Sequence, residues 1–260
     1  MNPFGIENVP FFALLAIRLG GLMMAAPVFG SPQVPLALRG ALALVLAFMF
    51  MPFAGPAPAG PTGAVAFALA AASELSVGLL IGFTASLLFA SVRLAGHLVD
   101  QDLGLSLASI LDPMADESIS VVGQFQTLLA VVVYLLINGH HVLMTSVADS
   151  FRAVPVGGFA FSAAATPSVV GDMAARLFVV ALGLAIPALA TLFLVTVAMA
   201  FLARAVPEMN LLTLGYPIRT LVGFAVLAAG VGIFVRGFAR FAADQEGLLR
   251  GLVVLLGGRP

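Results

Sequence analysis

The sequence predicts an all-α protein of the integral membrane type. Three observations lead to this fold class: 62% of the 260 residues are hydrophobic, only 9% are charged, and apolar stretches long enough for membrane helices follow one another along the chain. A soluble domain usually carries about 25% charged residues. A soluble fold of this composition would have too few polar side chains to cover its surface, so lipid or an apolar protein partner has to cover much of it.

Helices are the expected form of these stretches, because lipid cannot hydrogen-bond an open backbone. The alternating pattern of an outer-membrane barrel is absent from the sequence. Neither an internal repeat nor a separate soluble domain is evident, so residues 1–260 are expected to form a single domain. About six long apolar helices are predicted, near residues 9–29, 36–53, 64–92, 121–137, 176–203 and 219–236.

Proline and glycine end the first two predicted helices. The second ends at Pro52 and a glycine- and proline-rich stretch at residues 55–63. Three prolines mark a turn at the end of the first helix: Pro27, Pro32 and Pro35. Proline interrupts helical hydrogen bonding, so turns are expected at both places.

The third predicted helix and the first each carry one charge inside an apolar stretch, Glu74 and Arg18. Such a charge is costly unless it is paired or hydrated. Two explanations stay open: a partner contact or polar pathway, and an internal Arg18–Glu74 ion pair or snorkelling to an interface. The third helix also carries Gly78 and Gly82, a small-xxx-small pair that suits close helix packing.

The later predicted helices contain their own breakers. Asn138-Gly139 ends the fourth helix. Pro187 lies in the middle of the fifth and is expected to bend it, because proline removes a backbone hydrogen bond. A shorter amphipathic tail follows the sixth helix.

A polar zone after the third predicted helix holds Arg93, His97 and Asp100 at spacings of four and three. On a helix these three side chains share one face. A proton relay could use that arrangement. A polar stripe that contacts a partner protein is the simpler interpretation.

No enzyme chemistry is predicted. The chain has no cysteine, and it lacks the sequence signatures of esterases, zinc proteases, nucleotide-binding loops and dinucleotide-binding folds. His140 and His141 are adjacent, so on a helix they point about 100° apart and do not chelate one metal ion together. No cofactor or metal is expected, and no run of basic residues suggests nucleic acid.

The stretch 101–117, QDLGLSLASILDPMADE, is polar at both ends and apolar in the middle. A loop with so many leucine and isoleucine side chains would seldom be left in water. It is expected to be buried inside an assembly or across a pore. An ordinary re-entrant or interfacial helix is the alternative.

Four segments, at residues 18–44, 96–113, 136–157 and 203–223, together resemble the FliR family of flagellar type III export proteins. They read RLGGLMMAAPVFGSPQVPLALRGALAL, GHLVDQDLGLSLASILDP, LINGHHVLMTSVADSFRAVPVG and ARAVPEMNLLTLGYPIRTLVG. They are spread over nearly the whole chain in the family's order. No single segment is diagnostic, and the combination carries the resemblance.

The resemblance implies a structural subunit of the flagellar export gate, at the basal body in the bacterial inner membrane. Members of this family form a helical gate with FliP-like and FliQ-like subunits, with which FlhB-like and FlhA-like export proteins associate. Their apolar helices form hairpins that pack against these partners as well as lipid. Unfolded flagellar proteins pass through the gate.

In the FliR family the loop that matches residues 103–117 projects into the pore and helps to plug it. The resemblance therefore implies a steric plug of small and apolar side chains that blocks ions and can be displaced. Its expected members are Leu105, Ser106, Leu107, Ile110, Leu111 and Met114, with Asp112 and Pro113 fixing the turn.

Other functions stay open on the sequence alone. The virulence injectisome contains a related (SctT-like) gate subunit, although the NGHH and LGYP segments resemble the flagellar branch more closely. A small-solute secondary transporter is a more distant alternative, because repeat-related intramembrane charges are not evident. A membrane enzyme ranks third.

Overall fold

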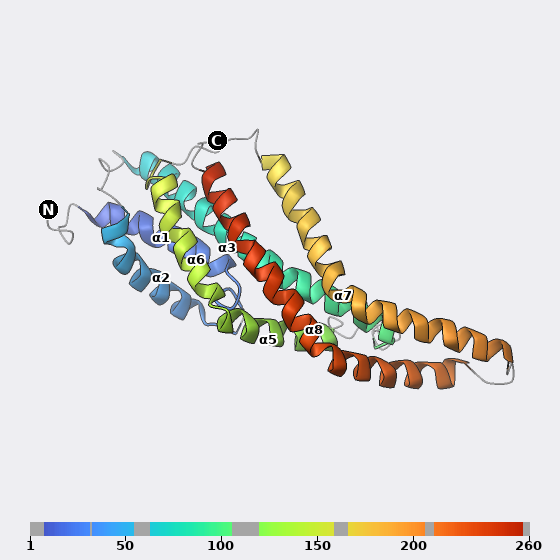
Figure 1. Cartoon of the computed structure of the whole chain (residues 1–260). Coiled ribbons are helices and arrows are strands. Elements are labelled where there is room, and N and C mark those ends of the chain that lie inside the picture. Colours follow the sequence, from blue (N-terminus) through green and yellow to red (C-terminus); the bar gives the residue numbers. More distant parts are fainter. Residues whose placement is uncertain are drawn as a thin grey trace. The chain divides into compact units, whose positions relative to one another are not determined.

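The computed structural model describes residues 8–31, 33–54, 63–105, 120–158, 166–205 and 211–256. Within these ranges the regular structure is helical, which confirms the predicted all-α class (Figure 1). The helices are α1 (Val9–Ala25), α2 (Leu36–Phe50), the short 3-10 helix η2 (Met51–Phe53), α3 (Ala64–Leu103), α5 (Val121–Leu136), α6 (Gly139–Ala153), α7 (Thr166–Ala205) and α8 (Leu211–Leu256).

Four helices differ from the predicted ones. α7 begins at Thr166 rather than near residue 176. α3 runs to Leu103 rather than ending near residue 92, and α8 joins the predicted sixth helix and the tail into one helix of 46 residues. α6 has no counterpart among the predicted apolar helices. In each case polar side chains interrupt the apolar composition, but they do not interrupt the helix, because most of them are compatible with helical backbone.

Four helical stretches in the described ranges are long and apolar enough to cross a membrane: Leu36–Phe53, Ala64–Leu103, Gly171–Ala205 and Pro217–Leu256. α5 and α6, taken together as one bent pair, would make a fifth. α1 is apolar but has only 17 residues. The membrane-type fold is therefore confirmed, with four or five candidate spans in the described ranges.

The chain divides into two compact units, and part of each of the three longest helices (α3, α7 and α8) belongs to each unit. The first unit consists of Met1–Leu87, Asn138–Met173 and Ala242–Pro260. The second consists of Leu88–Ile137 and Ala174–Phe241.

In the first unit α1 packs beside α2 and along the first part of α3 (Figure 1). The interior contains Leu15 and Leu19 of α1, Ile81 of α3 and Leu143 of α6, all of them buried. Burial of such side chains is the main stabilising contribution to the unit.

In the second unit α3 and α5 are antiparallel neighbours, and so are α7 and α8 (Figure 1). An aromatic cluster joins three of these helices. The ring centroid of Phe89 lies 5.3 Å from that of Tyr134 and 5.9 Å from that of Phe238, and both pairs meet edge to face. This geometry is favourable because the positive ring edge meets the negative ring face.

The two predicted breakers behave differently. Asn138 adopts a left-handed conformation with φ of 59° between α5 and α6, which asparagine tolerates better than most residues. α7 continues through Pro187, and the Thr191 hydroxyl donates to the Pro187 carbonyl at 2.9 Å. The first breaker ends a helix, whereas the second lies within one.

Candidate functional site

Arg18 of α1 and Glu74 of α3 form a buried ion pair in the first unit. Arg18 Nε donates to Glu74 Oε2 at 2.5 Å, and Arg18 Nη2 donates to Oε1 at 3.1 Å. The two side chains are only 1% and 0% exposed. Opposite charges at this depth are tolerated because each compensates the other through two hydrogen bonds.

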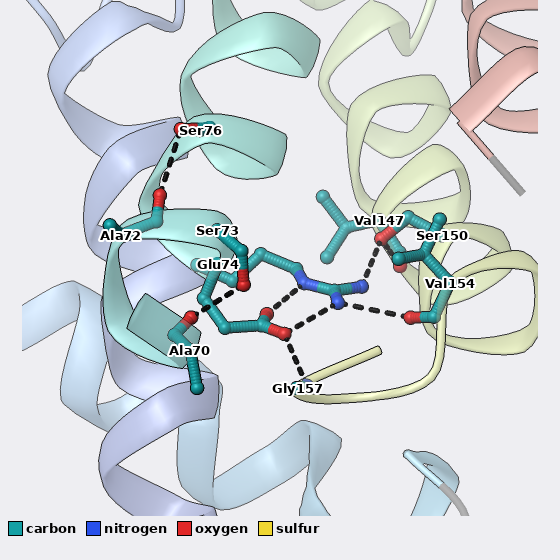
Figure 2. Close-up of polar contacts among 10 residues, drawn as sticks. Ala70, Ala72, Ser73, Glu74, Ser76, Val147, Ser150, Val154 and Gly157 are labelled. Atoms are coloured by element: carbon teal, nitrogen blue, oxygen red, sulfur yellow. Dashed lines mark hydrogen bonds and ion pairs between the residues drawn. The ribbon is translucent and has the colours of Figure 1, made fainter. Parts of the chain in front are cut away.

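The pair makes further hydrogen bonds to α6 and to the turn that follows it (Figure 2). Arg18 Nη1 donates to the Ser150 hydroxyl at 3.2 Å, and Nη2 donates to the Val154 carbonyl at 3.0 Å. Glu74 Oε1 also accepts the backbone N–H of Gly157 at 2.7 Å. We call these five residues the buried brace.

Two further contacts support the buried brace. The Ser150 hydroxyl donates to the Val147 carbonyl at 2.7 Å, so it is oriented to accept from Arg18. The Phe151 ring centroid lies 4.6 Å from the Arg18 guanidinium carbon, within the range of a cation–π interaction. All three guanidinium nitrogens and both carboxylate oxygens therefore have partners within the unit.

The internal ion pair, one of the two explanations for Arg18 and Glu74, is thus present in the structure. Chemically the arrangement fixes α1, α3 and α6 against one another. The sequence gives no signal for Ser150, Val154 or Gly157, because a serine and two backbone groups look ordinary until the helices are assembled.

Two glycines of α3 allow the helices to approach closely enough for the buried brace. A Cβ at Gly78 would overlap the carbonyl oxygen of Arg18. A Cβ at Gly82 would lie 2.9 Å from the Cβ of Ala25, closer than real side chains come. The small-xxx-small pair expected from the sequence lies at the contact between α1 and α3.

The polar zone of α3 is divided by the structure rather than gathered into one cluster. Arg93 is exposed, and half-buried His97 contacts the Gln101 amide at 3.1 Å between Nε2 atoms. Asp100 is 3% exposed, and its carboxylate accepts the backbone N–H of Val122 at 3.2 and 3.3 Å. Asp100 therefore compensates the N-terminus of α5, where unpaired N–H groups attract negative charge.

The predicted plug loop lies mostly outside the described residues, since its members from Ser106 to Met114 are not among them. On the α3 side the last described residue is Leu105, whose N–H donates to the Asp100 carbonyl at 3.2 Å after Gly104 turns with φ of 77°. On the α5 side the first described residue is Ser120, whose hydroxyl accepts from the Gly123 N–H at 2.8 Å as the N-cap of α5. Asp100 and Ser120 thus hold the two flanks of the loop at one helix pair.

A contact between α3 and α8 was not anticipated from the sequence. Arg219 forms an ion pair with Asp102, with 3.5 Å between Nη2 and Oδ1, and it also donates to the Thr196 hydroxyl of α7. The Thr220 hydroxyl donates to the Leu103 carbonyl at 3.2 Å. Arginine and aspartate near predicted loops are usually solvated, so nothing in the sequence distinguishes this pair.

Two further features of the described residues are a histidine pair and a cavity. His140 and His141 stack with ring centroids 4.2 Å apart, and within the described ranges no group of three or more His, Asp or Glu side chains could hold a metal ion. A cavity of about 290 Å³ in the second unit lies among α5, α7 and α8, and Gln126, Pro187 and Phe234 are among its lining residues. Its lining contains no ionisable side chain.

Known proteins match this chain over most of its length. Residues 9–244 match the family described as bacterial export proteins, family 1. The chain is 30% identical to flagellar biosynthetic protein FliR of Bacillus subtilis over 97% of its own length and 98% of that protein. It is 29% identical to the protein of the same name in Escherichia coli, over 85% and 84% of the two chains, and 27% identical to that of Aquifex aeolicus, over 81% of each.

This similarity covers the buried brace, the polar zone of α3 and the contact between α3 and α8. It places the chain among membrane components of flagellar export and not among enzymes. The chain therefore belongs to the bacterial export proteins, family 1, the family of flagellar biosynthetic protein FliR.

Proposed function

We propose that the whole chain, residues 1–260, acts as a structural subunit of the flagellar type III export gate in the inner membrane, at the basal body. With FliP-like and FliQ-like subunits it forms the channel through which unfolded flagellar proteins leave the cell. FlhB-like and FlhA-like proteins associate with this gate.

The observation that carries the proposal is similarity along nearly the whole chain to proteins named for flagellar biosynthesis. A match confined to one hydrophobic helix would carry little weight, because apolar segments resemble one another by composition. The three relatives named above are flagellar, which favours this branch over the virulence injectisome.

The exposed helix faces support a multi-subunit assembly. In the most apolar stretches of α2, α7 and α8 only 17%, 22% and 11% of the residues are buried. Exposed apolar area of this extent requires lipid or protein cover. The exposed large side chains of α2 are Leu36, Leu38, Leu44, Val45, Phe48 and Met49.

The polar groups divide between internal and external roles in this proposal. The buried brace is internal and keeps the helices of the first unit at fixed positions. Exposed Arg93 and half-buried His97 are available on the other unit, and we assign them to contacts with a partner subunit. Asp100 turns inward to α5 instead.

The loop of residues 103–117 acts as the plug in this proposal. Its apolar side chains, including Leu105, Leu107, Ile110, Leu111 and Met114, exclude ions because an ion loses its hydration in an apolar constriction. Ser106 contributes a small side chain to the plug, and Asp112-Pro113 forms the turn. The support from the described residues is that Asp100 and Ser120 hold the flanks.

Deletion of residues 106–114 tests this proposal. In assembled gates, the deletion is expected to raise ion leakage across the membrane, because the apolar obstruction is lost. A matched variant replaces the same residues with an equal number of Gly and Ser, which keeps the chain length and removes the apolar side chains. Membrane conductance of cells or of purified complexes in planar bilayers measures the effect.

Both variants should leak if apolar side chains form the plug. Leakage of the deletion alone would point to chain length as the barrier. Unchanged leakage in both variants, with normal gate assembly, would contradict the plug assignment.

A further inference from the structure

The last turn of α3 is attached to α8 by three contacts within the second unit. Asp102 pairs with Arg219 at 3.5 Å, and the Leu103 carbonyl accepts from Thr220 at 3.2 Å. The Leu103 side chain packs directly on Gly223, where an added Cβ would lie 3.2 Å from Leu103 Cγ and closer still to Cδ2. We call these five residues the α3–α8 joint.

The contact of the same turn with α5 is of a different kind. The Asp100 carboxylate is 3% exposed, and both oxygens accept from the α5 backbone. Separation would leave a buried charge and the buried N–H of Val122 without partners, which is strongly unfavourable. Asp100 therefore fixes α3 to α5.

The charges of the α3–α8 joint can separate more easily. The Asp102 side chain is 32% exposed and that of Arg219 is 25% exposed, so water can solvate both when they part. Arg219 also donates to the Thr196 hydroxyl on α7 and so keeps an acceptor after leaving Asp102. The buried Leu103 side chain loses its packing against Gly223.

We propose that the α3–α8 joint is a releasable latch: α8 parts from the last turn of α3 during export, while the Asp100 contact with α5 stays closed. This inference rests on the proposed export function, because it assigns the movement to the passage of an exported chain. It names Asp102 and Arg219 as the positioning residues of the closed state.

A reversible disulfide across the α3–α8 joint tests the proposal. The natural chain has no cysteine, so Leu103→Cys combined with Gly223→Cys introduces only the desired pair. The Leu103→Cys change also removes the side chain that would crowd a new Cβ at position 223. The full-length variant is produced in the native host in place of the natural copy, and export of flagellar proteins to the medium is measured with and without oxidant.

Oxidation is expected to abolish export, and reductant is expected to restore it. Leu103→Cys alone should respond to neither treatment. Continued export with the disulfide formed in nearly all molecules would overturn the latch. Failure of the disulfide to form in assembled gates would also overturn it, because the contact would not exist there.

A second set of variants tests the proposal if the double-cysteine variant does not assemble into gates. Asp102→Asn and Arg219→Gln should each raise ion leakage severalfold, since they weaken the closed state. The exchange of charges, Asp102→Arg with Arg219→Asp, should bring leakage back toward the natural level. Natural leakage in both single variants would overturn the proposal.

The export function is tested separately in the same host. The natural sequence must restore export to cells that lack their own copy. If it does not, the proposed function fails. If it does, and export is insensitive to the disulfide, the latch alone fails.

Discussion

Arg18 is a permanent charge buried with only 1% exposure. The cost of burying it is offset by Glu74 and by the acceptors on α6 and the following turn. Removal of one member leaves the other as an uncompensated buried charge. The buried brace should therefore respond very differently to single and double substitutions.

Glu74→Ala is expected to lower the free energy of unfolding by about 3–5 kcal/mol, because Arg18 then stays buried without its counter-charge. Arg18→Met combined with Glu74→Leu should be less destabilising than Glu74→Ala, since both charges are gone. Thermal unfolding of the detergent-solubilised protein measures both effects.

Glu246→Ala is the control for this comparison, because Glu246 pairs with Arg250 in an exposed i,i+4 contact. Its effect should be within about 1 kcal/mol. Equal stability of Glu74→Ala and Glu246→Ala would show that the buried brace does not form.

At the residue scale the sequence identified the two buried charges but not their surroundings. Arg18 and Glu74 are conspicuous because each is isolated in an apolar stretch. Ser150 and the backbone groups of Val154 and Gly157 are not, because their role depends on where α6 ends. The same holds for Asp102, whose partner is more than one hundred residues away in the chain.

At the scale of helix pairs, two glycines of α3 determine how closely α1 and α3 can approach each other. Gly78→Ala is expected to destabilise the protein by about 1–3 kcal/mol, since its methyl group would overlap the Arg18 carbonyl and the helices would have to move apart. Gly20→Ala is the matched control, because open space surrounds a Cβ at Gly20.

The same thermal unfolding measurement compares the two alanine variants. Gly20→Ala should be neutral or slightly stabilising, as alanine favours helix over glycine. Equal stability of Gly78→Ala and the natural protein would contradict the close packing of α1 and α3.

Asp100 links two elements, α3 and the N-terminus of α5. Asp100→Ala is expected to cost about 1–3 kcal/mol, because the buried N–H of Val122 loses its acceptor. Asp100→Asn retains an acceptor oxygen and should cost less. Hydrogen exchange at the first turn of α5 should accelerate in the alanine variant, whereas unchanged exchange would show that Asp100 does not hold this helix end.

Helix boundaries were predictable where proline or glycine coincides with the end of an apolar stretch, as at Asn138-Gly139. They were not predictable where a helix continues through polar residues, as α3 does past Arg93 and α8 does past Arg236. Hydrophobicity reports the environment of a segment, and backbone hydrogen bonding decides its length. The extra length of α3 brings Asp100 and Asp102 to α5 and α8.

For the whole molecule, composition and the order of apolar segments were enough to predict a helical membrane protein. The family resemblance added flagellar export, which the comparisons confirm. Composition alone could not supply the partners, because an exposed apolar face is equally suited to lipid and to another subunit. The exposed faces of α2, α7 and α8 are the surfaces at which contact with lipid can be distinguished from contact with another subunit.

Isolation of the assembled complex tests the central claim most directly. The tagged full-length chain is extracted from membranes of its native host in mild detergent, and the copurifying proteins are identified by mass spectrometry. Cells with the untagged chain set the background. Our account predicts FliP-like, FliQ-like and FlhB-like proteins in one detergent-stable complex with the chain. Recovery of a stable, monodisperse chain without these partners would contradict it.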